Sequence, residues 1–279
     1  MKLLRKVLLA GAVVVAAKGL DNRLEVSHYT VKSDKLPEEF DGFRILHLSD
    51  FHCDTTAGLV DAIKNEHPDI IFVTGDMTHD TGSYEPFTNL LQQIIDIAPV
   101  YIVSGNHDVW RSDYVELVDK CRELGAVVLQ NESSLVNREN SAILVSGIED
   151  PYFVNHDQIS EKIQDGLSKI TRFDGFNILL FHRANLLDIF KDCEFDLILS
   201  GHMHGGQFRI PGIGGVVSPK TNFIGNERIF FPKYFGGEYS LNNTKMIVSR
   251  GVGNPAILPR VFNRPEICTV ILKKNFITK

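Results

Sequence analysis

Cysteine is scarce in this chain, and its placement excludes the small domains that disulfides or zinc hold together. The 279 residues include four cysteines, Cys53, Cys121, Cys193 and Cys268. They lie far apart and form no Cys-x-x-Cys pair, so the sequence predicts neither a disulfide framework nor a zinc knuckle. Cysteine usage therefore leaves the redox compartment open.

Positive charge is also in short supply. Lysine and arginine number 29 against 35 aspartate and glutamate residues, which gives a net charge of −6. Proteins that bind nucleic acids usually present a basic face, so we expect no specific nucleic-acid partner. The hydrophobic content of 43% and the charged content of 23% are ordinary for a globular protein of this length. One large domain over residues 21–279 is the simplest organisation.

The apolar run near the N-terminus is shorter than the roughly 20 residues that a membrane-spanning helix needs. It extends from Val7 to Ala17, and basic residues flank it at Lys2, Arg5, Lys6 and Lys18. Because this arrangement is typical of a signal sequence or a membrane anchor, residues 1–20 are predicted to be one of these. The protein would then be exported or membrane-associated, with the side of the membrane left open. A first helix packed on the domain is the alternative.

Short apolar segments alternate with helical patterns along the chain. Branched aliphatic residues form runs typical of buried strands at residues 45–48, 70–73, 100–103, 178–181 and 197–199. Apolar residues at helical spacing predict helices at residues 59–66, 87–97, 114–124 and 159–170. The alternation predicts an α/β protein built in layers. Two late strands without a helix between them, at residues 246–249 and 267–272, indicate a second, partly antiparallel sheet.

Each of the five strand-like runs is followed by side chains that can bind a metal ion. In chain order these residues are Asp50 and His52, Asp76, Asn106 and His107, His182, and His202 and His204. Sites in open α/β sheets form beyond the carboxyl ends of the strands. We therefore expect these residues to meet in one crevice, although they are spread over more than half of the chain.

The chemistry of this set favours two divalent cations. Oxygen and imidazole ligands without thiolates suit manganese, iron or zinc, and the identity of the metal stays open. The carboxylate of Asp76 can bridge two ions with its two oxygens. Two ions about 3.5–4 Å apart would activate a water molecule and orient a phosphoryl group. His107 is not needed to complete the ligand set and is placed to protonate the leaving oxygen or to neutralise charge on the phosphoryl group.

These motifs resemble the signature of the calcineurin-like metallophosphoesterases. The matching segments, in the same order and strand context, are Asp50-x-His52, Gly75-Asp76, Gly105-Asn106-His107-Asp108, His182 and Gly201-His202-x-His204. The resemblance implies a four-layer αββα sandwich of two mixed β-sheets flanked by helices. It also implies that one metal binds Asp50, His52, Asp76 and His204, and that the other binds Asp76, Asn106, His182 and His202.

Further segments are similar to a bacterial branch whose members carry N-terminal membrane-targeting segments. These segments are Gly205-Gly206-Gln207, Ser249-Arg250-Gly251 and Arg264-Pro265-Glu266-Ile267. The branch includes a phosphodiesterase associated with the cell wall and a UDP-2,3-diacylglucosamine hydrolase. The resemblance therefore implies a lipid-linked or cell-wall-derived substrate and a membrane surface as partner.

A stretch rich in glycine, proline and aromatic residues follows the last histidines, between Gly205 and Tyr239. Long irregular connections inside compact domains are usually functional, so this stretch can form a rim beside the site. Aromatic residues are also usually buried, so the same stretch can instead plug the edge of the sandwich. Arg250 also has two possible roles. Its guanidinium can hold a substrate phosphate or form a structural ion pair.

One position departs from the protein phosphatases of this superfamily. They carry an aspartate and then an arginine where this chain has His79 and Asp80. The acid that orients the catalytic histidine is thus displaced, and Asp80 or Asp108 has to replace it. The leading hypothesis is hydrolysis of phosphodiester or pyrophosphate bonds by metal-bound hydroxide. A phosphomonoesterase acting on nucleotides or phosphoproteins and a non-catalytic metal-binding scaffold are the alternatives.

Overall fold

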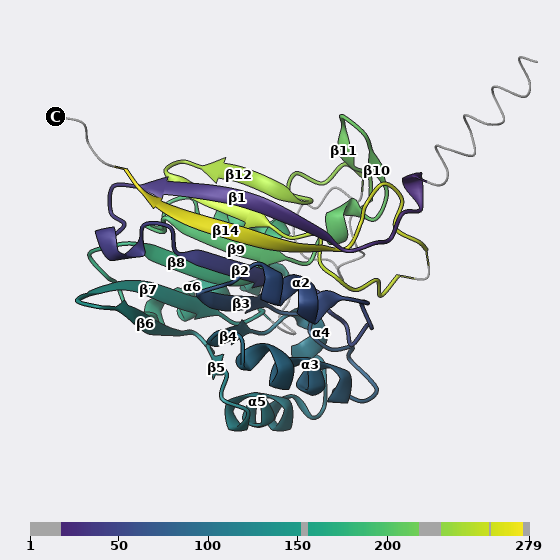
Figure 1. The fold of residues 1–279 in the computed structure, drawn as a ribbon, viewed down its shortest axis with the longest axis horizontal. Helices are drawn as coiled ribbons and strands as arrows, with labels where there is room; N and C mark the ends of the chain where they lie inside the picture. Colours follow the sequence, from purple (N-terminus) through teal and green to yellow (C-terminus); the bar gives the residue numbers. More distant parts are fainter. Residues whose placement is uncertain (1–17, 152–155, 218–229, 257, 276–279) are drawn as a thin grey trace, which may run out of the picture.

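Two β-sheets packed face to face form the centre of the molecule, and helices cover both outer faces (Figure 1). The computed structural model describes residues 18–151, 156–217, 230–256 and 258–275. The predicted α/β sandwich of two mixed sheets in four layers is confirmed. Most of the predicted leader, residues 1–20, lies outside the described residues. Within the described part of the chain, no helix is both long enough and apolar enough to cross a membrane.

The first sheet has the strand order β1-β14-β2-β3-β4-β5. Its strands are β1 (Glu25–Ser33), β2 (Arg44–Leu48), β3 (Ile70–Thr74), β4 (Val100–Val103), β5 (Val127–Val128) and β14 (Glu266–Lys274). Strands β2 to β5 run parallel, whereas β14 lies antiparallel to β2. Figure 1 shows β14 beside β1, so the last strand of the chain pairs with the first.

The second sheet has the strand order β12-β13-β9-β8-β7-β6. Its strands are β6 (Glu132–Arg138), β7 (Ser141–Ile148), β8 (Asn177–Arg183), β9 (Leu197–Gly201), β12 (Gly237–Leu241) and β13 (Thr244–Val248). The four central strands run parallel, and the edge strands β6 and β12 are antiparallel to their neighbours. The predicted second, partly antiparallel sheet is confirmed, and both predicted late strands form. They lie in different sheets, because β13 joins the second sheet while β14 inserts between β1 and β2 of the first.

Helices lie where their apolar faces can cover a sheet. The first sheet is covered by α2 (Leu59–Asn65), α3 (Glu85–Ile95) and α5 (Tyr114–Glu123), and the second by α6 (His156–Lys169) and the 3₁₀-helix η2 (Ala184–Phe190). The four predicted helices are thereby confirmed. Shorter elements are η1 (Glu38–Phe40), α4 (Asn106–Val109), η3 (His204–Gly206), β10 (Arg209–Ile210) and β11 (Gly214–Gly215).

The central strands are buried on both faces, which explains their unbroken apolar sequence. Successive side chains of a strand point to opposite faces. Ile45 of β2 therefore packs between the sheets, whereas Leu46 packs under the helices. In β8, Ile178 and Leu180 pack between the sheets. His182 continues that inner series and so lies between the sheets near the end of its strand.

The packing between the sheets generates a stability prediction. Phe72 of β3 is fully buried there and meets Tyr101 edge to face, with 5.9 Å between ring centroids. Truncating a buried phenylalanine leaves a cavity, so we predict that Phe72→Ala lowers the free energy of unfolding in urea by about 3–5 kcal/mol. The control Leu135→Ala, at a position on β6 that is 46% exposed, should change it by less than about 0.5 kcal/mol. Equal losses in the two variants would contradict this packing.

Candidate metal centre

The eight predicted site residues lie at the carboxyl edge of the sandwich, where five parallel strands end. Asp50 and His52 follow β2, Asp76 follows β3, Asn106 and His107 follow β4, His182 lies near the end of β8, and His202 and His204 follow β9. All are buried except His107, which is half-buried. The structure therefore brings these residues together from five separate segments of the chain. Their assignment as ligands stays a prediction.

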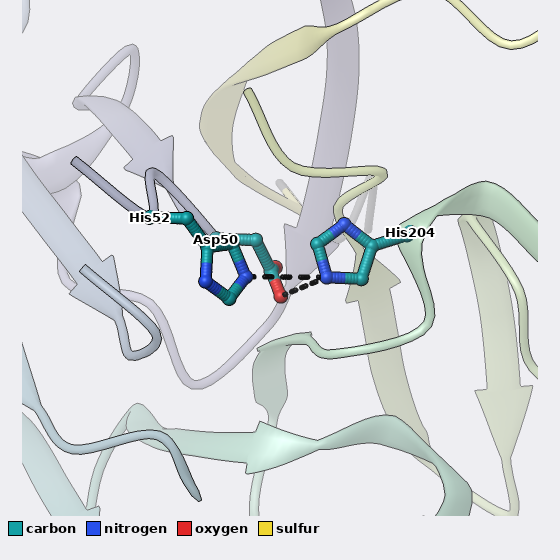
Figure 2. Close-up of side chains that lie close together, drawn as sticks. All are labelled: Asp50, His52 and His204. Carbon is teal, nitrogen blue, oxygen red and sulfur yellow. Dashed lines mark hydrogen bonds and ion pairs between the residues drawn. The ribbon is translucent and has the colours of Figure 1, made fainter. Parts of the chain in front are cut away.

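The first group of candidate ligands is Asp50, His52 and His204 (Figure 2). Nε2 of His204 lies 3.3 Å from Oδ1 of Asp50 and 3.3 Å from Nε2 of His52. The two imidazole rings stack with their centroids 5.1 Å apart. Figure 2 shows the three side chains pointing toward one another, so their donor atoms converge as the ligands of one ion would.

The second group is Asp76, His182 and His202. Nε2 of His182 lies 3.2 Å from Oδ2 of Asp76 and 3.2 Å from Nδ1 of His202. On the other side of its ring, Nδ1 of His182 hydrogen-bonds to the carbonyl oxygen of Thr74 at 2.7 Å. Such a hydrogen bond fixes the ring orientation and turns Nε2 toward the position of a metal.

Asp76 lies between the two groups. Oδ2 of Asp76 is 3.7 Å from Nε2 of His52, and Oδ1 accepts a hydrogen bond of 2.8 Å from the backbone N–H of His107. Oδ1 of Asn106 is buried and accepts no hydrogen bond within the described residues. A buried polar atom needs a partner, and a metal ion would provide one. Lone pairs that converge in this way need positive charge between them, so the donor set fits two divalent cations.

Backbone strain accompanies the candidate ligands. Positive φ angles between 45° and 74° occur at Asp50, His52, Asp76, His202 and His204. For residues other than glycine, this conformation costs about 1–2 kcal/mol each. Strain of this kind persists at functional sites, where the surrounding structure imposes it. The sharp reversals after the strands turn these side chains back toward the common crevice.

Gly75 and Gly105 allow the loops after β3 and β4 to touch. A Cβ atom on Gly75 would lie 2.3 Å from the backbone nitrogen of Gly105. A Cβ atom on Gly105 would lie 2.2 Å from Oδ1 of Asp76. No side chain fits at either position, so these glycines permit the close approach that sets Asp76 against the N–H of His107.

Of the two acids that the sequence offered as partners of the His107 imidazole, Asp80 lies within ion-pair range and Asp108 is engaged elsewhere. Oδ1 of Asp80 lies 3.8 Å from Nδ1 of His107, which is within ion-pair range but too long for a hydrogen bond. The carboxylate of Asp108 instead accepts hydrogen bonds from the backbone N–H and hydroxyl of Thr78 and from the backbone N–H of Gly105. Asp108 thus ties together the loops after β3 and β4.

Burial keeps most of the site histidines neutral. It lowers the pKa of His52 to about 3 and holds the pKa values of His202 and His204 well below the usual range. These three imidazoles are therefore unprotonated at neutral pH, the form that binds metals.

The carboxylates give His182 the opposite shift. Burial opposes its positive charge, but Asp76 and Asp50 outweigh that effect and raise the pKa of His182 to about 9. Burial, with a contribution from Asp76, raises the pKa of Asp50 to about 6. Burial also raises the pKa of Asp76. The neighbouring His182 outweighs this effect and holds the pKa of Asp76 well below the usual range.

The structure adds Arg260 to the site, which the sequence motifs did not indicate. Its side chain is buried, and Nη2 lies 3.3 Å from Nδ1 of His204 and donates to the carbonyl oxygen of Gly253. Nε and Nη1 have no acceptor within the described residues. His79 is a second addition, since its ring centroid is 5.2 Å from that of His52. No local motif marks Arg260, because 56 residues separate it from His204.

Arg250 forms structural ion pairs, which is one of the two roles that the sequence left open for it. Its Nη2 lies 2.9 Å from Oε1 of Glu266 and 3.2 Å from Oε2 of Glu25. Glu266 is fully buried and also accepts a hydrogen bond from the backbone N–H of Arg250. These ion pairs fasten the loop after β13 to β14 and β1.

The pKa of His182 generates a prediction for metal binding. Below about pH 9 the metal-free ring carries a proton that a cation must displace, so the affinity for Mn²⁺ should rise as the pH increases toward 9. We expect release of about one proton per chain at pH 7 and a roughly tenfold gain in affinity per pH unit. Calorimetry in two buffers of different ionisation enthalpy measures the release. The control His28→Gln alters a surface histidine that pairs with Glu66, so this variant should release the same number of protons as the unaltered protein. Metal binding that does not depend on pH would contradict the prediction.

Comparison with known proteins agrees with this geometry. The family model described as calcineurin-like phosphoesterase matches residues 43–206, which contain every predicted ligand. The chain is 28% identical over 266 residues to "Uncharacterized metallophosphoesterase YkuE" of Bacillus subtilis (strain 168), covering 90% of this chain and 86% of that protein. It is 26% identical over 235 residues to "Phosphodiesterase YaeI" of Escherichia coli (strain K12), covering 81% and 80%.

A vertebrate protein is also similar. The chain is 26% identical over 283 residues to "Transmembrane protein with metallophosphoesterase domain" of Danio rerio, covering 94% of this chain and 61% of that protein. The family model spans more than half of the chain and includes both groups of candidate ligands. The chain therefore belongs to the calcineurin-like phosphoesterases, hydrolases of phosphoric esters that use two divalent metal ions.

Proposed function

We propose that this protein hydrolyses phosphodiester or pyrophosphate bonds. The observation that carries the proposal is the charge beside His107, where the half-exposed carboxylate of Asp80 lies 3.8 Å away. Near neutral pH a phosphomonoester carries close to two negative charges on its phosphoryl group, whereas a diester or a disubstituted pyrophosphate carries one on each phosphorus. Asp80 therefore repels the monoester group more strongly. Arg250 does not offset this charge, because Glu266 and Glu25 already pair with it. The printed name of the similar Escherichia coli protein, a phosphodiesterase, supports the same reaction.

The side chains of the site divide the work of the reaction. When bound, the two metal ions would activate a water molecule and polarise the phosphoryl oxygens. Neutral imidazoles and ionised Asp76 would hold those ions in the buried crevice. His107 lies at the edge of both groups, with its ring centroid 5.0 Å from that of His52, and its side chain is 27% exposed. It can therefore reach a substrate and donate a proton to the leaving oxygen.

We extend the proposal to substrates at a membrane or in the cell wall. The apolar run from Val7 to Ala17, with its basic flanks, supports export or anchoring of the chain. A lipid-linked or cell-wall-derived phosphodiester would then be the natural substrate.

Paired hydrolysis assays test the proposal. The full chain is stripped of metal, reloaded with Mn²⁺ and assayed on bis-p-nitrophenyl phosphate and on p-nitrophenyl phosphate. We expect faster cleavage of the diester, and recovery of that activity only after metal is restored. A preference for the monoester would instead establish the phosphomonoesterase alternative. No turnover of either compound with Mn²⁺, Fe²⁺ or Zn²⁺ would support the scaffold.

Removing the candidate acid generates a prediction that depends on the leaving group. His107→Gln should lower kcat by about 10²–10⁴-fold on an alkyl ester, whose leaving oxygen needs a proton. The loss should be much smaller on a p-nitrophenyl ester, since p-nitrophenolate leaves without protonation. Bound metal, measured by elemental analysis, should stay at two ions per chain. The matched variant Asp80→Asn keeps the imidazole and should lose far less activity on the alkyl ester; equal losses on both esters would contradict acid catalysis by His107.

A further inference from the structure

Exposed apolar side chains gather beside the metal centre. We call this set the apolar rim, which consists of Leu20, Ile210, Ile213, Phe230, Phe231 and Leu258. Each of these side chains is between 41% and 66% exposed. Elsewhere in the described residues, the exposed large hydrophobic side chains are Val115, Val127 and Leu135. Single exposed apolar residues need no explanation, but a concentration of them marks an interaction surface.

Backbone hydrogen bonds join the segments that carry the apolar rim. The pairs, with the N–H donor first, are Phe262 with Gly19, Arg209 with Val261, and Phe231 with Val216. In Figure 1 the start of the described chain, the β10–β11 hairpin and the loop that precedes β14 lie at the same end of the molecule. The segments that carry the apolar rim are therefore neighbours in space, although they come from distant parts of the sequence.

The tip of the β10–β11 hairpin presents two isoleucines on a rigid turn. The N–H of Ile213 donates to the carbonyl oxygen of Ile210 at 2.9 Å, and Gly212 between them has φ 82°. Proline followed by glycine with positive φ defines a type II turn, here at Pro211 and Gly212. Such a turn does not require apolar residues at its corners. The exposure of Ile210 and Ile213 is therefore unfavourable in water unless a partner covers them.

The apolar rim adjoins a candidate metal ligand. The backbone N–H of Gln207 donates to the carbonyl oxygen of His204 at 3.1 Å, and its side-chain Nε2 donates to the carbonyl oxygen of Leu258 at 2.6 Å. Arg260 contacts the ring of His204 two residues after Leu258. A partner that covers the apolar rim would therefore lie next to the phosphoesterase site.

We propose that the apolar rim docks onto a lipid bilayer and brings the metal centre to phosphodiesters in that surface, an inference that rests on the proposed function. The sequence before the described residues indicates the occupant. Its apolar run ends at Ala17, and the chain enters the described structure at Lys18, two residues before Leu20 of the apolar rim. A segment that favours membranes therefore leads directly into this surface. Apolar side chains on a protruding turn insert into the interfacial layer of a bilayer without crossing it.

Site-directed tryptophan fluorescence tests the proposal with the full, Mn²⁺-loaded chain. Ile213→Trp places a probe in the apolar rim, and Leu135→Trp places a matched probe on β6, at the end of the molecule opposite the β10–β11 hairpin in Figure 1. Both variants keep Trp110, the one native tryptophan. Vesicles of equal parts phosphatidylcholine and phosphatidylglycerol are added, with or without bromine in the acyl chains. We expect a blue shift and quenching by brominated lipid for Ile213→Trp, and no change beyond wild type for Leu135→Trp.

Equal responses of the two probes, or no vesicle binding by either, would overturn the proposal. A second pair of probes provides an independent measurement, because a local probe separates the apolar rim from the leader. Phe231→Trp should respond as Ile213→Trp does, whereas Val115→Trp should respond no more than wild type. Equal responses in this pair would also count against docking. Hydrolysis of soluble bis-p-nitrophenyl phosphate is measured on each variant. Because this reaction needs no membrane, its absence would refute the proposed function without being confused with failed docking.

Discussion

Two carboxylates buried next to each other set the constraint on which the rest of the site depends. Asp50 and Asp76 have almost no contact with water. Asp76 opposes ionisation of Asp50, whereas His182 favours the ionised form of both carboxylates. Burying like charges is strongly unfavourable unless opposite charge lies among them. In the metal-free protein the protonated form of His182 supplies part of that charge. Two divalent cations would displace this proton and supply the positive charge in its place. The donor geometry and the protonation states thus have one cause.

The fold stabilises this unfavourable arrangement of side chains and loops. Parallel strands from both sheets end at the same edge, so loops from different parts of the chain meet there without long connections. Gly75 and Gly105 then allow backbone contact between two of these loops, and Asp108 binds them together. Left-handed backbone conformations at five candidate ligands persist because the packed core behind them leaves the loops no relaxed alternative. The stable packing of the two sheets therefore fixes the positions of the candidate ligands at the edge of the sandwich.

Much of this was predictable because buried parallel strands leave a clear record in sequence. Runs such as residues 70–73 and 178–181 are apolar on both faces, and polar residues begin where the strands end. The edge strands β6 and β12 escaped prediction because their exposed faces carry polar residues and their apolar content is low. The position of β14 in the first sheet was not predicted either, because β14 pairs with β1 and β2, which precede it by more than 200 residues in the sequence.

The same distinction separates the predicted site residues from those that were missed. The candidate ligands sit in short motifs directly after strands, so their spacing alone indicates a common function. Arg260 and His79 reach the site through loops whose course depends on the whole fold, and neither lies in a motif of ligand spacing. The choice between Asp80 and Asp108 likewise required three-dimensional distances, because both acids stand near His107 or its loop.

The reaction depends on a pair of ions that Asp76 would hold close enough to act on one phosphoryl group. Electron paramagnetic resonance of the Mn²⁺-saturated protein tests for this pair directly, because ions about 3.5–4 Å apart that share a bridging carboxylate are magnetically coupled. We predict two Mn²⁺ ions per chain with an exchange-coupled spectrum, which Asp76→Asn converts to the spectrum of isolated ions. A single bound ion, or two uncoupled ions in the unaltered protein, would contradict a site in which Asp76 bridges two ions.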